Sequence, residues 1–212
     1  MESLLIPLFP LSIVVFPGEE LKLHIFEPRY KQLIHDCKRD ELKFGIPPYI
    51  EGKSLRIGTE LQLKEIKKVY EDGKMDIIAT GTGWFEIVEF YRILQGKLYP
   101  GGTVIKNRWD NESDIVMNAR LVELIEELYT IMKITNVPVP SPSSFKTYML
   151  GHKLGLNIDQ EMHLLTLEDE VSKLQYLINH LENLIPMLIE TENLRRKAEM
   201  NGHFQNILPP GL

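Results

Sequence analysis

The segment HIFEPRYKQLI, residues 24–34, changes its hydrophobic pattern halfway along and so marks a junction between two kinds of secondary structure. In the residues that lead into it, 20–26, apolar side chains alternate with polar ones, with Leu21, Leu23 and Ile25 on one face. Such alternation is typical of a half-buried strand. After Glu27 the apolar residues recur every three or four positions, which indicates a helix with one apolar face.

The predicted helix begins at Pro28, because proline fits the first helical turn, where an N–H group has no partner within the helix. Its apolar face consists of Tyr30, Leu33, Ile34 and Cys37. Glu27 and Arg29 flank the proline. Paired charges near a core more often hold local geometry than contact a ligand, so we expect these two to stabilise the strand–helix corner.

Further strands are predicted on both sides of Asp72-Gly73, a dipeptide that favours a two-residue hairpin turn. We expect Gly81-Thr82-Gly83 to form a bend or bulge before the next strand. Pro100 and the glycines after it favour a strand at the edge of the sheet or a bend. The predicted strands are residues 20–26, 58–66, 74–80, 84–90 and 98–107.

Beyond residue 113 the apolar period changes from two to about 3.6. A long amphipathic helix over 115–132 is interrupted by the proline-rich 137–144, and shorter helices follow near 145–154 and from 159. The last helix is predicted to begin at Thr166 as N-cap with Asp169 at N3, and Pro186 should kink or split it. Its apolar positions are Val171, Leu174, Ile178, Leu181, Ile185 and Leu188.

The predicted fold class is therefore α+β, with a β-rich unit over residues 1–110 and a helical unit over 111–212. We expect the C-terminal NILPPGL, residues 206–212, to be disordered. The chain has 212 residues, 43% of them hydrophobic, and a formal net charge of −6. No apolar run approaches the roughly 18 residues that span a bilayer, and the N-terminus lacks the basic region of a signal peptide.

Composition also bears on partners and location. Nucleic-acid binders usually carry a basic face, so the acidic balance and interleaved charges argue against nucleic acid. A single cysteine, Cys37, forms no internal disulfide and suits a reducing cytoplasm. On the apolar helix face it should be a buried, inert thiol rather than a nucleophile or metal ligand. We expect no metal site and no cofactor.

Fragments that mimic active-site motifs fail on their context. Gly52-Lys53-Ser54 resembles the end of a phosphate-binding loop, the Walker A motif, but Pro47 stands where that loop needs glycine and a strand follows instead of a helix. The serines of 141–144 with Lys146 suggest a Ser-Lys dyad, yet serines before a helix more often act as N-caps. The sequence predicts no enzyme.

A longer stretch carries a family resemblance: IPLFPLSIVVFPGEELKLHIFEPRYKQLI, residues 6–34. It resembles the start of the N-terminal, substrate-binding domain of Lon proteases, with Pro7 to Leu11, Phe16-Pro17-Gly18 and Phe26 to Tyr30 as the matching elements. Gly58-Thr59, Asp72-Gly73 and Gly81 with Phe85 continue the match, and the helical residues 154–181 extend it.

The resemblance implies a PUA-like β-barrel with one embedded helix, followed by a helical bundle. It implies a stand-alone domain without the ATPase and Ser-Lys peptidase modules, which recognises unfolded or partner polypeptides, and the context we expect for it is protein quality control. Aromatic residues on a curved sheet can hold unfolded segments by burying apolar surface. The candidate binding residues are Phe16, Pro17, Glu27, Arg29, Tyr30, Trp84 and Phe85.

Two other classes of function stay open at this point. One is a small-molecule or regulatory-ligand module in the cleft of the barrel, because concave apolar clefts bind such ligands. The other is RNA binding, which rests on fold analogy alone and is opposed by the acidic charge. The apolar stripe of residues 171–188 packs either within the bundle or against a second copy of the chain, as a homo-oligomer.

Overall fold

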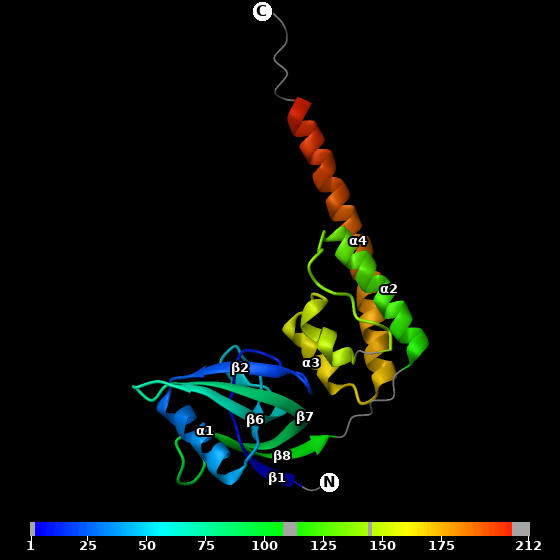
Figure 1. Cartoon of the computed structure of the whole chain (residues 1–212). Helices are drawn as coiled ribbons and strands as arrows, with labels where there is room; N and C mark the ends of the chain where they lie inside the picture. Colours follow the sequence, from blue (N-terminus) through cyan, green and yellow to red (C-terminus); the bar gives the residue numbers. More distant parts are fainter. Residues whose placement is uncertain (1–2, 108–113, 144–145, 205–212) are drawn as a thin grey trace, which may run out of the picture. The chain divides into compact units, whose positions relative to one another are not determined.

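The computed structural model describes residues 3–107, 114–143 and 146–204. Apart from one helix after the second strand, the strands come first and the other helices follow, which confirms the α+β class (Figure 1). The chain forms two compact units, one of Met1–Glu112 with Lys146–Glu170 and the other of Ser113–Phe145 with Val171–Leu212. The prediction placed all of 111–212 in one helical unit, whereas residues 146–170 group with the strands. The predicted disorder of 206–212 lies outside the described residues.

The first unit is built on a six-stranded sheet of order β1-β8-β7-β6-β3, with β2 paired to β7. Its strands are β1 (Ser3–Pro7), β2 (Glu20–Ile25), β3 (Phe44–Ile46), β6 (Ile57–Val69), β7 (Met75–Tyr91) and β8 (Gly101–Asn107). All these ladders are antiparallel. After β1, single parallel bridges join Leu8 to Gly45 and Leu11 to Pro48. No continuous ladder joins β1 to β3, so the predicted barrel is not closed among the described residues.

Strand β7 is longer than the sequence analysis predicted, since residues 74–80 and 84–90 belong to one strand. The predicted bulge at Gly81-Thr82-Gly83 is confirmed. Glu60 of β6 pairs with Gly83 and the next residue pairs with Gly81, which leaves Thr82 as the extra residue. An extra residue bends a strand without ending it. This is why the two segments remain continuous.

Two local predictions in the sheet are wrong. The hairpin at Asp72-Gly73 has three loop residues, because Tyr70 and Lys74 are still joined by a hydrogen bond of 2.9 Å, and Gly73 takes a φ of +74°. Strand β8 is not an edge, since it lies between β1 and β7. Its glycines serve packing instead: a Cβ on Gly101 would overlap Leu94.

Helix α1 (Pro28–Asp40) begins at Pro28, as predicted, and covers one face of the sheet (Figure 1). The four residues of its predicted apolar face are all buried. They join the larger core of the first unit, which also contains buried residues of β2, β3, β6 and β7. A second, smaller core consists of Ile6, Leu8, Phe85, Ile87 and Val104.

The helical residues of the first unit are the 3-10 helix η1 (Thr147–Lys153) and helix α3 (Ile158–Thr166). Asn157 caps α3, and Gln160 completes a capping box. Both helices lie close to their predicted positions. The predicted cap at Thr166 is wrong, because Thr166 ends α3 and α4 (Glu170–Phe204) begins four residues later.

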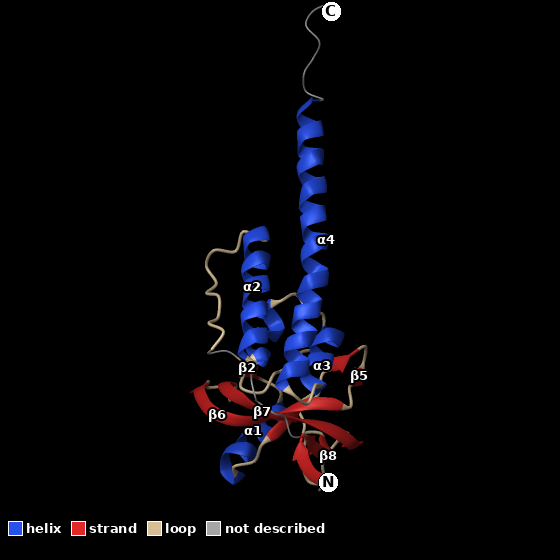
Figure 2. Ribbon diagram, turned by 90° about the vertical axis from the view of Figure 1, so that its right-hand side faces the viewer, coloured by secondary structure: helices blue, strands red, loops and turns tan. Residues whose placement is uncertain are grey.

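The second unit consists of α2 (Ile115–Ile131), the loop after it, and most of α4. An ion pair from Arg120 to Glu182 (2.9 Å) joins the two helices, and a second one, from Lys133 to Glu192 (3.5 Å), joins the loop after α2 to α4. Helix α4 continues past α2 (Figure 2). The buried positions of the predicted stripe on α4 are Leu174, Ile178, Leu181 and Ile185, which confirms the packing face.

Pro186 lies inside α4 and does not split it, so the split that was predicted as the alternative to a kink is absent. A proline removes the donor to the carbonyl four residues earlier, here that of Glu182. Glu182 and Pro186 both lie at exposed positions, where water can take the place of the missing donor. Val171, at the start of the predicted stripe, is also exposed.

Among the described helices, none combines the length and the apolar character that crossing a lipid bilayer would require.

Candidate functional site

A groove of about 850 Å³ opens on the surface of the first unit. Ligand sites in proteins commonly enclose roughly 300–1,000 Å³. The groove lies among the segment after β1, the start of α1, the hairpin β4–β5, the second half of β7, and the segment that leads to β8. Hydrogen bonds, an ion pair, ring stacking and strand pairing hold these elements in place.

The hairpin of β4 (Tyr49–Ile50) and β5 (Lys53–Ser54) forms one side of the groove. Glu51 and Gly52 at its turn both have positive φ, +49° and +81°, the combination that a type I′ turn requires. The hairpin is tied to the segment after β1, because Tyr49 N–H donates to the Leu11 carbonyl at 2.7 Å. This attachment presents Tyr49 and Lys53 to the groove.

The start of α1 contributes Arg29 and Tyr30. Arg29 Nη2 lies 2.7 Å from Glu27 Oε2, so the two charges pair with each other at the strand–helix corner, as predicted. The guanidinium also lies over the Tyr30 ring, 4.5 Å from its centroid. Tyr30 in turn stacks on Phe9 with 3.8 Å between ring centroids. Arg29 is therefore held in place at the groove.

A bulge in β7 brings apolar side chains to the groove. Ile87 pairs with Val104 of β8, but the next pair is Glu89 with Thr103, so Val88 is the extra residue. The side chains of Val88 and Phe90 are 54% and 40% exposed. Large apolar side chains that remain this exposed inside a concave surface are available to a ligand.

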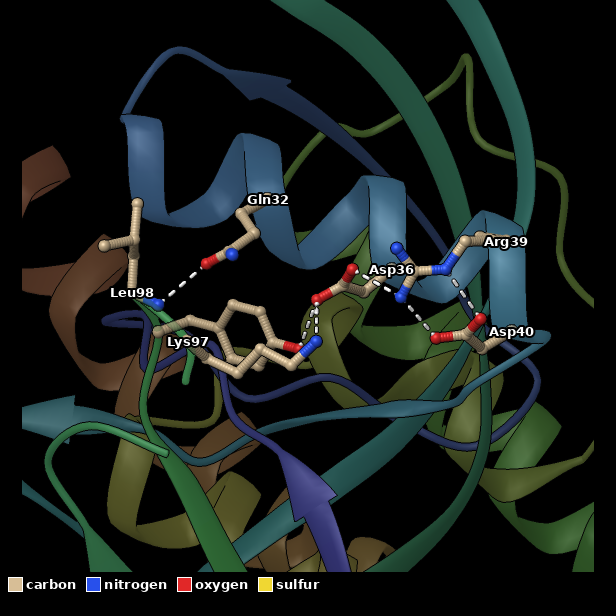
Figure 3. A network of polar contacts seen from close by, with 7 residues as sticks. Gln32, Asp36, Arg39, Asp40, Lys97 and Leu98 are labelled. Carbon is tan, nitrogen blue, oxygen red and sulfur yellow. Dashed lines mark hydrogen bonds and ion pairs between the residues drawn. The ribbon is translucent and has the colours of Figure 1, made fainter. Parts of the chain in front are cut away.

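The segment between β7 and β8 forms the last wall, through Arg92 and Pro100. A polar network attaches this segment to α1 (Figure 3). Asp36, buried on α1, accepts hydrogen bonds of 2.7 Å from Lys97 Nζ and from the Tyr99 hydroxyl. Burial alone would raise the pKa of Asp36, but these hydrogen bonds and the nearby cations lower it overall.

The electrostatics of the groove are one-sided. Arg29, Lys53, Arg56 and Arg92 line it, and there is no Asp or Glu among the described residues of its lining. Arg29 is paired with Glu27, which lies beside the lining. In the part of the chain that the structure describes, the side chains of Lys53, Arg56 and Arg92 have no hydrogen-bond or ion-pair partner. The groove thus combines exposed apolar groups with unneutralised positive charge.

The candidate binding residues predicted from the sequence separate into two groups. Arg29 and Tyr30 line the groove, with Glu27 paired behind them. The other four lie in the interior, where the structure gives them packing roles: Phe16, Pro17, Trp84 and Phe85 are all buried. Phe16, for example, stacks on Tyr148 with 5.3 Å between ring centroids.

Sequence reasoning missed most of the groove. Tyr49, Arg56 and Arg92 carry no local motif, and the bends that bring them together depend on the whole sheet. Lys53 stood out only as part of a phosphate-loop mimic, and the structure shows strands around it and no following helix. The sequence holds one usable signal, since the spacing of Phe85, Ile87 and Phe90 departs from a period of two, as a bulge or a change of face would make it.

Among the described residues, no group of three or more His, Cys, Asp or Glu side chains is arranged to hold a metal ion. Cys37 is buried, as predicted.

Comparisons with known proteins agree on one family. The family model described as the ATP-dependent protease La (LON) substrate-binding domain matches residues 5–192. A Lon N-terminal domain protein from Xanthomonas campestris is similar in structure, with a TM-score of 0.66, 25% identity, and 83% of this chain and 98% of that chain covered. The N-terminal domain of a Mycobacterium avium complex Lon protease shares the fold, with a TM-score of 0.59, 15% identity, and coverage of 84% and 98%. A search of curated proteins found no match.

Proposed function

We propose, because this chain belongs to the family of LON substrate-binding domains, that it recognises segments of other polypeptides in the groove described above. The proposal assigns binding to this chain and no covalent chemistry. The context that fits such binding is protein quality control, in which unfolded chains expose apolar segments that folded proteins bury.

The observation that carries this proposal is the set of exposed apolar side chains inside the groove. Tyr49, Val88 and Phe90 are all at least 40% exposed. Burying a large apolar side chain completely contributes about 1.5–3 kcal/mol, and these three side chains, which are already partly buried, contribute less than that each. Apolar side chains of the bound peptide add to this gain, and the cost of ordering the peptide opposes it. Rigid aromatic groups are also typical anchors of binding surfaces.

The direct test is a fluorescence anisotropy titration of a labelled, permanently unfolded polypeptide with the wild-type chain and with Phe90→Ala. We expect Phe90→Ala to raise the Kd about fivefold or more, because it removes an anchor from the groove. Phe26→Ala is the matched control, since Phe26 is 58% exposed and does not line the groove. Unchanged affinity in Phe90→Ala, or absence of wild-type binding at high micromolar concentration, would contradict the proposal.

The volume of the groove also suits a small regulatory ligand. Thermal-shift screening separates the two, because a ligand that binds only the folded state raises the Tm. A metabolite that raises the wild-type Tm, but not that of Phe90→Ala, and that displaces no polypeptide would favour the small ligand.

A further inference from the structure

We infer that the groove selects acidic polypeptide segments, in which Asp or Glu side chains flank one or two large apolar residues. This inference rests on the proposed function and adds the chemical class of the segment that binds. It follows from the positive charges that surround the exposed apolar groups, and from the absence of Asp and Glu among the described residues of the groove lining.

The three unpaired cations come from different walls of the groove. Lys53 lies on the hairpin, Arg56 immediately before β6, and Arg92 immediately after β7. Their side chains are exposed at the groove, with no carboxylate partner in the described parts of the chain. A peptide that lies along the groove therefore meets positive charge on more than one side of its apolar anchors.

Elsewhere in the unit, several cations are paired with carboxylates. Lys43 and Lys106 both pair with Glu60, and Lys64 pairs with Glu20. The whole chain has a formal net charge of −6. Other exposed lysines, such as Lys22 and Lys67, also have no acidic partner in the described parts of the chain, but they lie outside the groove. In the groove, unpaired positive charge surrounds exposed apolar side chains, and a groove lined by one sign of charge attracts ligands of the other sign.

The chemistry of the cations favours carboxylates. A guanidinium matches a carboxylate with two parallel hydrogen bonds, and the partial removal of water inside a groove strengthens such pairs. Arg56 and Arg92 are free to make them, whereas Arg29 already pairs with Glu27. A basic segment would instead face repulsion from the three unpaired cations of the lining, Lys53, Arg56 and Arg92.

A nucleic acid is the other polyanion with groups that stack on aromatic side chains. We favour a peptide because a nucleic acid continues its phosphate charge beyond the groove, over the surface of a chain whose net charge is −6. An acidic peptide segment can confine its charge to the positions that face the cations.

The experiment compares three labelled 12-residue peptides with the same two apolar anchors, whose other positions carry Glu, Gln or Lys. Each is titrated by fluorescence anisotropy against the full chain at low and at physiological salt. The groove variant is Lys53→Gln/Arg56→Gln/Arg92→Gln. The control is Lys22→Gln/Lys67→Gln/Lys153→Gln, which removes three exposed positive charges that lie outside the groove lining. Circular dichroism establishes that both variants are folded.

We expect the Glu peptide to bind the wild type about tenfold more tightly than the Gln peptide, with the Lys peptide weakest, as three partly screened charge pairs would produce. The groove variant should remove this preference while retaining affinity for the Gln peptide, and the control variant should retain the preference. Added salt should weaken the Glu peptide most.

The failures are distinguishable. Equal affinity for all three peptides, reduced in Phe90→Ala, would overturn the charge selectivity and leave polypeptide binding intact. If none of the three peptides binds, both the charge selectivity and the proposed polypeptide binding are contradicted. A single-stranded oligonucleotide that displaces the Glu peptide at lower concentration than unlabelled peptide, and loses this ability in the groove variant, would overturn the assignment in favour of nucleic acid.

Discussion

Glu19 Oε2 and His152 Nε2 lie 3.1 Å apart, although 133 residues separate them along the chain. The same carboxylate oxygen accepts the Phe16 N–H at 2.9 Å. On its other side the imidazole is close to Glu161, with 2.7 Å between Nδ1 and Oε1. His152 therefore joins the segment before β2 to the short helices of the first unit through two carboxylates.

This cluster predicts a stability that depends on pH. The hydrogen bond to Glu19 raises the pKa of His152 from 6.5 to about 9; burial opposes this shift, and Glu161 adds to it. A pKa that is raised in the folded state gives a stabilisation that is complete below the unfolded pKa and is lost as the pH rises through the folded one. We expect the Tm of the wild type to fall between about pH 7 and 9.5.

His152→Gln should lower the Tm at pH 6 and should have much less effect at pH 9.5, where the imidazole is neutral in the unfolded state and mostly neutral in the folded state. His35→Gln is the matched control, because His35 is exposed on α1. Differential scanning calorimetry across this range makes the comparison. A Tm difference between wild type and His152→Gln that stays constant with pH would contradict the role of the imidazolium.

Gly151 is predicted to be intolerant of alanine because a Cβ there would overlap the Phe16 ring. Overpacking of this kind costs about 1–3 kcal/mol. Phe16→Leu should relieve the overlap, so the double variant should be at least about 1 kcal/mol more stable than the sum of the single effects predicts. Urea unfolding of the four proteins measures this coupling, and strict additivity would show that the two residues are not in contact.

Asp36→Ala should destabilise the chain by about 1–3 kcal/mol, because it leaves the buried Tyr99 hydroxyl without its acceptor. Tyr99→Phe in the Asp36→Ala background removes the orphaned hydroxyl and should cost little more. The same unfolding experiment tests this. If Tyr99→Phe in the Asp36→Ala background lowers the free energy of unfolding as much again as Asp36→Ala alone, the result would contradict the hydrogen bond between these two residues, which holds the wall of the groove.

The Cys37 thiol should resist alkylation in the native protein. Burial, reinforced by Asp36 and Asp40, raises its pKa to about 12. The reactive thiolate is then only on the order of 10⁻⁴ of the thiol at pH 8. Mass spectrometry after iodoacetamide treatment should detect modification of Cys37 in guanidinium chloride and little in buffer. Rapid labelling of the native protein would show that the thiol is accessible and reactive, which would contradict this prediction.

Local pattern was enough to predict much of this fold. Period-two alternation located β2, and the switch at Pro28 located α1 with its buried face, because those signals depend on neighbouring residues alone. The bulge at Thr82 was also readable from its flanking glycines. The wrong predictions concern positions where distant contacts decide, as with β8, whose glycines make room for Leu94 and Leu8.

The groove was much less predictable than the fold. Aromatic residues near the family motifs suggested an exposed face, but Phe16 and Phe85 are buried. Phe16 packs against Tyr148 of η1, far along the chain, and Phe85 belongs to the smaller core. The cations Arg56 and Arg92 are 36 positions apart and share no spacing. They line the same groove because of the path that β6 and β7 take through the sheet, and no local sequence pattern specifies that path.

The most direct test of polypeptide recognition is a map of the binding surface by two-dimensional ¹H–¹⁵N NMR during titration with an unlabelled, unfolded polypeptide. The account predicts chemical-shift changes concentrated at residues 49–56, which are the β4–β5 hairpin and the two residues after it, and at residues 87–92. Changes concentrated on α2 and α4 instead, or no changes at saturating polypeptide, would contradict it.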